Sequence, residues 1–416
     1  MPAILGSKTV MVMILTVLFA GDLVRYSLSV PVWAVIVLAG TAWAIAVLWT
    51  NHVSWRQLPV PLVAVLAWWV VSPLWSPYAA SSALMLIPAI ITVLIGWALV
   101  TAAPIDELVR RIALTLRMVL AGSVVFEIAV ALYGHPVYPV GTDVTASTPI
   151  EVAWSRALFF TPGARIQGLV GNANILGMLA LVLGIIAVWR LYVARNWRNV
   201  SAIDIALSIA LVSRTNSATV TVAILGIGVV VAITALARQS GLWWRIGTWG
   251  SVLVVLSGMA LTVARWSDVS ALLGKSPDLT HRFDIWAAVV TRIADQPVIG
   301  HGFVGWWPSW DPWFEIHSID GVPMLEAHNV WLDLTMQTGI IGTIGFAITL
   351  GYLLWFLGRE FYRSPRSDAT VPFVLLVALT IQSLTESRIL IEWGLAVVVI
   401  CALEVTRIRT RSISRR

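Results

Sequence analysis

Charge is scarce in this chain, and lysine and cysteine are almost missing. Only 12% of the 416 residues are Asp, Glu, Lys or Arg, and the only lysines are Lys8 and Lys275. A soluble domain carries about 25% charged residues, so this composition excludes an ordinary globular protein. The single cysteine, Cys401, excludes an intramolecular disulfide and a metal site built on several cysteines.

Histidine is also sparse and shows no metal-binding pattern. The chain has six histidines, and neither H-E-x-x-H nor a similar ligand spacing occurs. We therefore predict neither a metal site nor a cofactor. Five of the six lie in segments expected on one side of a membrane: His135, His281, His301, His317 and His328.

Long apolar runs fill most of the sequence. Hydrophobic residues make up 59% of the chain, and its mean hydropathy is +0.87. Runs of about 17–25 apolar residues can cross a bilayer, and backbone groups in lipid need helical hydrogen bonds. We predict an all-α polytopic membrane protein, a single integral domain over residues 1–416 with about 12 transmembrane helices. The expected spans are 9–28, 30–49, 58–74, 79–101, 112–133, 168–190, 199–213, 216–237, 243–264, 328–357, 371–386 and 390–406.

The distribution of Lys and Arg predicts the orientation. With a cytoplasmic N-terminus, inner segments hold 17 of the 27 basic residues and outer segments hold nine. Cytoplasmic segments of membrane proteins carry such an excess, so we expect both termini in the cytoplasm. The net charge of +6 then indicates contact with the lipid bilayer, whose inner leaflet is anionic. We predict no nucleic-acid partner, because the cations are spread over separate segments.

Two expected outer segments are long, and the second is rich in aromatic residues. The first runs over 134–167, and the second runs over 265–327, before the tenth span. Loops longer than about 12–15 residues are usually functional or disordered. Tryptophans of the second predict a short element in the membrane interface that binds the acceptor or closes the site, and an aromatic anchor is the alternative. These tryptophans are Trp306, Trp307, Trp310 and Trp313.

His328 begins the tenth span and is the candidate catalytic residue. It precedes Asn329 and an apolar run, so it lies at the positive end of a helix dipole. That position favours the neutral imidazole, the form that a general base needs. A polar cap at the membrane surface is the simpler reading. Asp333, about one turn later, would orient His328, meet an arginine or face water.

Three arginines on the expected outer side could bind a pyrophosphate. Arg165 and Arg214 border spans, and Arg282 lies in the aromatic-rich segment, where Trp286 would share its helical face. A single arginine near a bilayer often only extends toward water. Three together suit a phosphate ligand, because arginine stays charged and binds phosphate oxygens in pairs.

These motifs resemble those of the O-antigen ligase and O-antigen polymerase superfamily of bacterial membrane glycan transferases. Four motifs occur in this order along the chain: R-x-x-x-W, P-x-x-G-x-G, H-N-x-x-L and G-x-x-G. Two further motifs lie before these four. The first is R-x-x-G with N-x-N-x-x-G, and the second is an S-R-T turn. The residues that carry the resemblance are Arg165, Gly168, Asn172, Asn174, Gly177, Ser213, Arg214, Thr215, Arg282, Trp286, Pro297, Gly300, Gly302, His328, Asn329, Leu332, Gly339 and Gly342.

The resemblance implies a glycosyltransferase of the bacterial cytoplasmic membrane that serves polysaccharide and cell-envelope biosynthesis. Such enzymes transfer a glycan from undecaprenyl pyrophosphate to a hydroxyl of a glycan or glycolipid acceptor, without metal, at a site facing outside. By this resemblance His328 is the general base, and Arg214 and Arg282 hold the pyrophosphate, with Arg165 as a further candidate. The family's Gly-Ala after Arg214 is Thr-Asn here, which leaves the register of that motif open. Attack opposite the leaving group would invert the anomeric centre.

Several alternatives remain open. A polymerase of the same superfamily would differ only in its acceptor. A lipid-linked glycan flippase or secondary transporter would place ionisable residues at mid-membrane, where Arg117 and Glu127 are candidates. A polyprenyl-monophosphate sugar transferase would use acids of the first outer loop, which offers Asp22.

Overall fold

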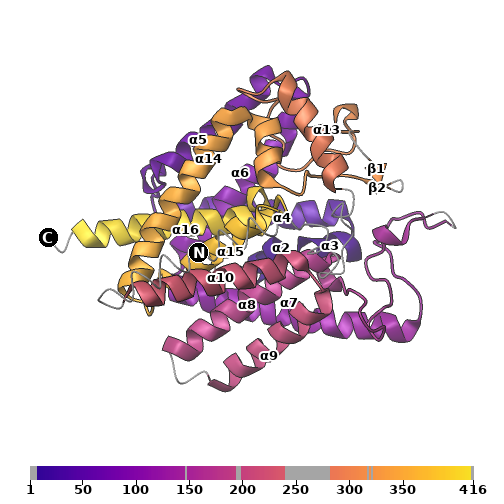
Figure 1. The fold of residues 1–416 in the computed structure, drawn as a ribbon, viewed down its shortest axis with the longest axis horizontal. Helices are drawn as coiled ribbons and strands as arrows, with labels where there is room; N and C mark the ends of the chain where they lie inside the picture. Colours follow the sequence, from indigo (N-terminus) through magenta and orange to yellow (C-terminus); the bar gives the residue numbers. More distant parts are fainter. Residues whose placement is uncertain are drawn as a thin grey trace.

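The protein, seen here as a computed structural model, is built almost entirely of helices (Figure 1). The structure describes residues 7–145, 148–193, 198–238, 282–315, 318–319 and 322–413. Its helices are α2 (Lys8–Phe19), α3 (Gly21–Ser27), α4 (Val30–Thr50), α5 (Val60–Val71), α6 (Ala79–Ala102), α7 (Ile105–Tyr133), α8 (Ala173–Val193), α9 (Arg198–Thr215), α10 (Ala218–Ala237), α13 (Arg282–Asp295), α14 (Val330–Arg363), α15 (Thr370–Gln382) and α16 (Glu392–Ile413). The 3-10 turns are η1 (Trp55–Gln57), η2 (Ser72–Trp75), η3 (Ile150–Val152), η4 (Gly168–Val170), η6 (Pro312–Phe314) and η7 (Arg388–Leu390), and a hairpin joins β1 (Ser318–Ile319) to β2 (Val322–Pro323).

Six of the described helices are long and apolar enough to cross a membrane: α4, α6, α7, α8, α10 and α14. The bent pair α2 and α3, with 79° between its halves, makes a seventh if it counts as one span. The predicted all-helical membrane class is confirmed. The count of twelve spans and the cytoplasmic termini stay predictions, and the expected span 243–264 lies outside the described residues.

The starts of α7 and α8 differ from the sequence prediction. α7 begins at Ile105, not at residue 112, because ion pairs one turn apart (Asp106 with Arg110, Glu107 with Arg111) support a charged first stretch. α8 begins at Ala173, not at residue 168. Gly168 and Gly171 adopt positive φ angles that end a helix, so this segment forms the turn η4.

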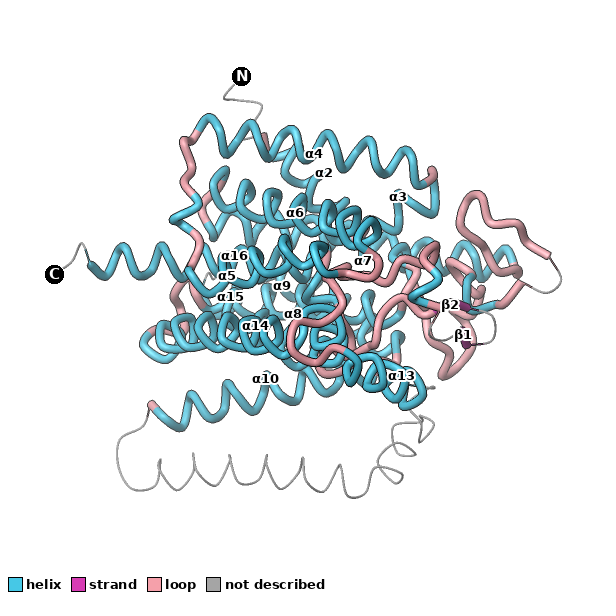
Figure 2. The backbone as a smooth tube through the Cα atoms, turned by 90° about the horizontal axis from the view of Figure 1, so that it is seen from above, coloured by secondary structure: helices cyan, strands magenta, loops and turns pink. Residues whose placement is uncertain are grey.

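Helix α16 lies inside the bundle, whereas α4 and α10 lie on opposite sides of it (Figure 2). Every residue from 393 to 405 is buried. The helix α6 packs closely on it, since a Cβ at Gly96 would lie 3.2 Å from the Ala396 carbonyl oxygen. Within their most apolar windows, α4 and α10 are only 17% and 11% buried. Their exposed apolar faces suit lipid.

Two charged residues of α7, Arg117 and Glu127, have partners within the bundle. Arg117 donates two hydrogen bonds, of 2.6 and 2.7 Å, to the buried carboxylate of Asp204 on α9. Glu127 accepts hydrogen bonds from the backbone N–H groups of Gln167 and Gly168 and from the Ser155 hydroxyl. These two residues are the mid-membrane candidates for transport, and their contacts give them structural roles.

The long helix α14 is broken at Gly339, which has φ +67°. Hydrogen bonds with residues 297–301 replace the helical hydrogen bonds that are missing at the break. Ile340 donates to the Pro297 carbonyl at 2.9 Å, and His301 donates to the Met336 carbonyl at 3.0 Å. The P-x-x-G-x-G segment therefore supplies the backbone partners that a broken membrane helix needs.

Glycines make this insertion possible. A Cβ on Gly300 would lie 2.3 Å from the backbone nitrogen of Gly339, so only glycine fits. Gly345, two turns further, faces Val65 of α5, where a Cβ would come within 3.1 Å of the valine side chain. The triplet spacing of glycines thus serves two purposes: helix packing at Gly345 and loop insertion at Gly339.

Candidate functional site

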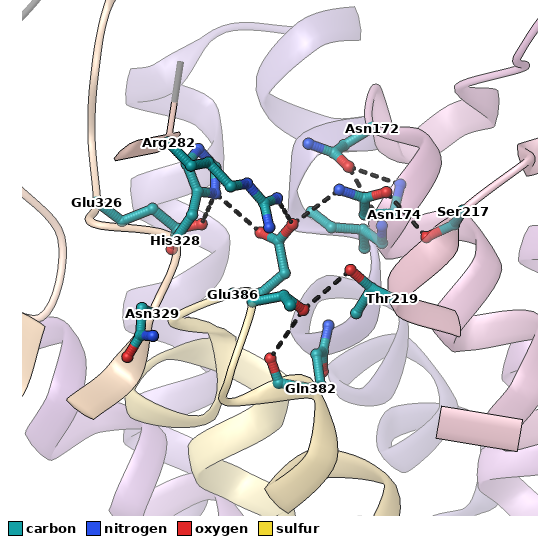
Figure 3. Close-up of polar contacts among 12 residues, drawn as sticks. Asn172, Asn174, Ser217, Thr219, Arg282, Glu326, His328, Asn329, Gln382 and Glu386 are labelled. Atoms are coloured by element: carbon teal, nitrogen blue, oxygen red, sulfur yellow. Dashed lines mark hydrogen bonds and ion pairs between the residues drawn. The ribbon is translucent and has the colours of Figure 1, made fainter. Parts of the chain in front are cut away.

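Glu386 is the centre of a buried polar cluster (Figure 3). It lies between α15 and η7, and its Oε1 accepts hydrogen bonds from Arg282 at 2.9 Å and from Asn174 at 2.7 Å. Its Oε2 lies 3.1 Å from Nδ1 of His328. Glu326 is the fifth member, with its Oε1 2.9 Å from the same Nδ1. We call these five residues the Glu386 cluster.

The residues of the cluster come from four separate elements. Arg282 begins α13, and one turn later the Trp286 indole donates to the Ala327 carbonyl at 2.9 Å. This contact ties α13 to the segment that carries Glu326 and His328. Asn174 stands in the first turn of α8, whose start is capped by Asn172. The supporting role of Trp286, expected on the helical face of Arg282, stays a prediction.

Local backbone conformation aims His328 at the carboxylates. His328 has φ +50°, a left-handed conformation that is uncommon for residues other than glycine. Asn329 follows as the N-cap of α14, and its side-chain oxygen accepts hydrogen bonds from the N–H groups of Trp331 and Leu332. Backbone strain of this kind costs about 1–3 kcal/mol and tends to occur at functional sites.

Asp333 positions the two segments of the site without touching His328. Its buried carboxylate accepts hydrogen bonds from the Ala327 N–H at 3.2 Å and from the Ser387 hydroxyl at 2.6 Å. Trp307 also donates to it, at 2.7 Å. The expectation that Asp333 orients His328 directly, meets an arginine or faces water is therefore wrong. It fixes the chain next to His328 and next to Glu386 instead.

The electrostatics of His328 are the reverse of the sequence prediction. Burial alone would lower the pKa of His328, but the carboxylates of Glu386 and Glu326 outweigh it and raise the pKa to about 10. Burial would raise the pKa of Glu386, but His328 and then Arg282 hold it well below its usual range. The helix dipole favours a neutral imidazole, yet two carboxylates at hydrogen-bond distance favour the imidazolium more strongly.

Arg165 reaches the cluster through Asn174. It donates to the side-chain oxygen of Asn174 at 2.6 Å and to the Thr215 carbonyl at 2.9 Å. Burial lowers the pKa of Arg165, Glu386 partly restores it, and the positive charges of Arg156 and Arg282 lower it further. Arg156 is thus an electrostatic neighbour of the site, and its buried Nε has no hydrogen-bond partner among the described residues.

Arg214 points elsewhere in this structure. Its guanidinium donates to the backbone carbonyl of Phe159 and lies over the Phe159 ring, 5.5 Å from its centroid. Its own carbonyl accepts a hydrogen bond from the N–H of Ile166, next to Arg165. No contact with the Glu386 cluster is found for Arg214 in the described part of the chain. Its role in pyrophosphate binding stays a prediction.

The four tryptophans of the second long outer segment differ in their surroundings. Trp307 is 2% exposed, donates a hydrogen bond to Asp333 and lines an internal cavity. Trp313 lies under the guanidinium of Arg292, at 4.0 Å, and against Tyr78. Trp310 is 63% exposed. The expected interfacial element is therefore partly a small core, and Trp310 is its clearest free surface.

A second ionic cluster lies beside Trp306. Arg25 pairs with Asp22 and Glu392, and Arg388 pairs with Glu392 at 2.6 Å. The Trp306 ring lies between the two guanidinium groups, 5.6 Å from that of Arg25 and 5.2 Å from that of Arg388. We call Asp22, Arg25, Arg388 and Glu392 the Glu392 cluster. Asp22 is paired there, which leaves little support for a sugar transferase that depends on it.

An apolar cavity of about 630 Å³ adjoins the Glu392 cluster. Helices α2, α4 and α6 form its walls, together with residues 304–310. Arg25, Leu325 and Glu392 line it as well, so it reaches the residue next to Glu326. Such a cavity between helices suits a lipid chain whose polar end lies near the charged groups.

Glu326, His328 and Glu386 could also be read as three metal ligands. One atom from each lies within 4.8 Å of the others. We assign the group to ion pairing, because Arg282 and Asn174 already occupy Oε1 of Glu386 and a metal ion would compete with the guanidinium. The metal-free site stays a prediction.

Sequence reasoning missed Glu326, Glu386 and Arg156. Each is a single charged residue without periodic spacing, and Glu386 lies 58 residues from its partner His328. An acid at the end of an apolar run was the available signal for Glu386, since such a residue requires a buried partner.

Comparison with known proteins supports the motifs. A search of the curated proteins finds no match to the chain. A family model described as O-antigen ligase matches residues 168–347, a region that contains Arg214, Arg282, Glu326 and His328. Members of this family are bacterial inner-membrane enzymes that act on glycans as ligases or polymerases. The match over residues 168–347 supports the resemblance to the O-antigen ligase superfamily.

Proposed function

We propose that the protein is a membrane glycosyltransferase of the O-antigen ligase type. It transfers a glycan from undecaprenyl pyrophosphate to an acceptor hydroxyl on the outer face of the cytoplasmic membrane, without a metal ion and with inversion. The observation that carries the proposal is the convergence of Arg282, His328, Glu326 and Glu386 at one site beside an apolar cavity. The polyprenyl chain suits the cavity, and the pyrophosphate suits the cationic groups.

Arg282 and His328 have the chemistry to bind the leaving group. Charge develops on the pyrophosphate as the glycosidic bond breaks, and fixed cations in a site poor in water lower that barrier. Arg282 uses one nitrogen for Glu386 in the described contacts, and its guanidinium carries five N–H donors. Arg165 and Arg156 extend the positive region on the side of Asn174.

The test uses the purified full-length protein with a synthetic undecaprenyl-pyrophosphate glycan, an acceptor and EDTA. We expect His328→Ala and Arg282→Ala each to lower the transfer rate by about 10²–10³-fold, while Arg359→Ala, at an exposed arginine of α14, keeps the wild-type rate. Transfer by either site variant at the wild-type rate would contradict its catalytic role. Loss of activity in EDTA, restored by a metal ion, would contradict the metal-free mechanism.

Two further readouts separate the alternatives. A polymerase would lengthen the lipid-linked glycan itself, whereas a ligase would modify a separate glycan or glycolipid acceptor. A flippase would move the glycolipid across liposomes and form no new glycosidic bond.

A further inference from the structure

We propose that Glu326 accepts the proton of the attacking hydroxyl through its Oε2, while His328 remains a cation facing the leaving pyrophosphate. The inference rests on the proposed function. It gives the role of base to a residue outside every motif of the sequence.

The carboxylate oxygens of the Glu386 cluster are unequally occupied. Oε1 of Glu386 holds Arg282 and Asn174, and Oε2 of Glu386 and Oε1 of Glu326 both face Nδ1 of His328. Oε2 of Glu326 is buried and has no hydrogen-bond partner among the described residues. An unsatisfied buried acceptor costs about 1–3 kcal/mol, and more if it is charged. A bound acceptor hydroxyl would supply the missing donor.

His328 is poorly suited to accept that proton. Its Nδ1 lies between two carboxylates, so it must carry a hydrogen to bind them. Of the groups paired with these carboxylates, only Arg282 has a permanent charge, so an imidazolium balances the second carboxylate. An imidazolium has no lone pair with which to take a proton. In this form His328 can still donate a hydrogen bond to the leaving group.

Glu386 is also a poor base, whereas Glu326 is suitably placed. Both oxygens of Glu386 already face cationic or N–H donors. Glu326 is 6% exposed, and its chain neighbour Leu325 is 37% exposed and lines the apolar cavity. Glu326 thus belongs to the cluster, and the residue before it belongs to the wall of the cavity. Its free oxygen is buried, so the acceptor has to uncover it on binding.

In the proposed step, one O–H bond and one glycosidic bond break while one new glycosidic bond forms. The acceptor O–H bond breaks, and its proton passes to Oε2 of Glu326. The hydroxyl oxygen forms a bond to the anomeric carbon as the bond from that carbon to the pyrophosphate oxygen breaks. The electron pair of the broken bond leaves with undecaprenyl pyrophosphate, near Arg282 and His328. Glu326 then releases the proton to water.

Azide as a substitute acceptor separates a base from a leaving-group cation, because azide attacks without losing a proton. We expect Glu326→Gln to lower transfer to the hydroxyl acceptor by about 10²–10⁴-fold while glycosyl azide forms within a few-fold of the wild-type rate. His328→Gln should lower both reactions. Glu315→Gln, at an exposed glutamate before the hairpin, is the matched control and should change neither.

The other outcomes would contradict either the role of Glu326 as the base or the proposed function. If Glu326→Gln keeps hydroxyl transfer, or loses both reactions equally although it is folded and binds the donor, Glu326 is not the base. If His328→Gln loses only hydroxyl transfer, His328 is the base and the inference is overturned. If the wild-type protein makes neither product, the proposed function itself fails. Thermal unfolding of each variant in detergent checks its folding.

Discussion

The Glu386 cluster and the Glu392 cluster lie close together and have similar composition, yet they differ in how the charges of their acids are balanced. In the Glu392 cluster, two arginines meet two acids, and aromatic rings cover the guanidinium groups. In the Glu386 cluster, two acids share one arginine, one histidine and one asparagine. Each cluster has a buried atom without a hydrogen-bond partner among the described residues: the acceptor Oε2 of Glu326 in the Glu386 cluster and the donor Nε of Arg25 in the Glu392 cluster.

This difference separates a structural ion network from a reactive one. A buried ion pair compensates its desolvation only when all its hydrogen-bonding groups are satisfied. The Glu392 cluster balances its two acids with two arginines that stay protonated, and it joins α3 to the start of α16. The Glu386 cluster keeps a titratable group and a free oxygen, which are the features that a transfer reaction can use. Arg388 connects the two: burial lowers its pKa, and Glu392, followed by Glu326, raises it above its ordinary value.

The largest effect is expected at the centre of the reactive cluster. Glu386→Gln removes the charge that holds both Arg282 and the imidazolium of His328. We expect transfer to fall by about 10³-fold or more, because the change disturbs two groups that each contribute about 10²–10³-fold. Initial rates at saturating donor give the measurement. A fall of less than tenfold in the folded variant would show that Glu386 is not needed to hold Arg282 and His328 for transfer.

The matching change in the other cluster should act on stability. Glu392→Gln leaves Arg25 and Arg388 with only Asp22. We expect a loss of about 1–3 kcal/mol in unfolding free energy, less than for a fully buried pair because the Glu392 side chain is 27% exposed. Transfer per folded molecule should stay within about threefold of the wild type. Denaturation in detergent, followed by rates on the folded fraction, measures both, and a rate loss as large as that of Glu386→Gln would remove the contrast.

The smallest expected effect is on the pH dependence of stability. The pKa of His328 rises from 6.5 to about 10 on folding, so His328 contributes stability that is complete below pH 6.5 and is lost as the pH rises through about 10. His328→Gln should therefore flatten the decline in thermal midpoint between pH 7 and 10. Glu392→Gln serves as the control and should keep the wild-type slope. An equal decline in wild type and His328→Gln would show that the imidazolium is not held by the fold.

Much of the fold follows from local pattern, and so does part of the site. Apolar runs predicted the membrane helices, because a helix satisfies its own backbone within a single segment. The motif residues Arg282, Trp286, His328 and Asn329 indicated a site that the structure assembles. The insertion of residues 297–302 into the break at Gly339 was not foreseen, although both glycine patterns were recognised. Spacing alone does not show that two glycine-rich segments meet.

The sequence by itself determined the class of protein, most of the helical segments and several polar residues of the candidate site. Those properties depend on composition and on neighbours a few residues apart. Only the tertiary structure decided the charge state of His328, because Glu326 and Glu386 reach it from different parts of the chain. It also decided which tryptophan is buried, and which carboxylate oxygen is left free. Charge and hydrogen bonding act over a few ångströms in space, so they depend on which segments the fold brings together.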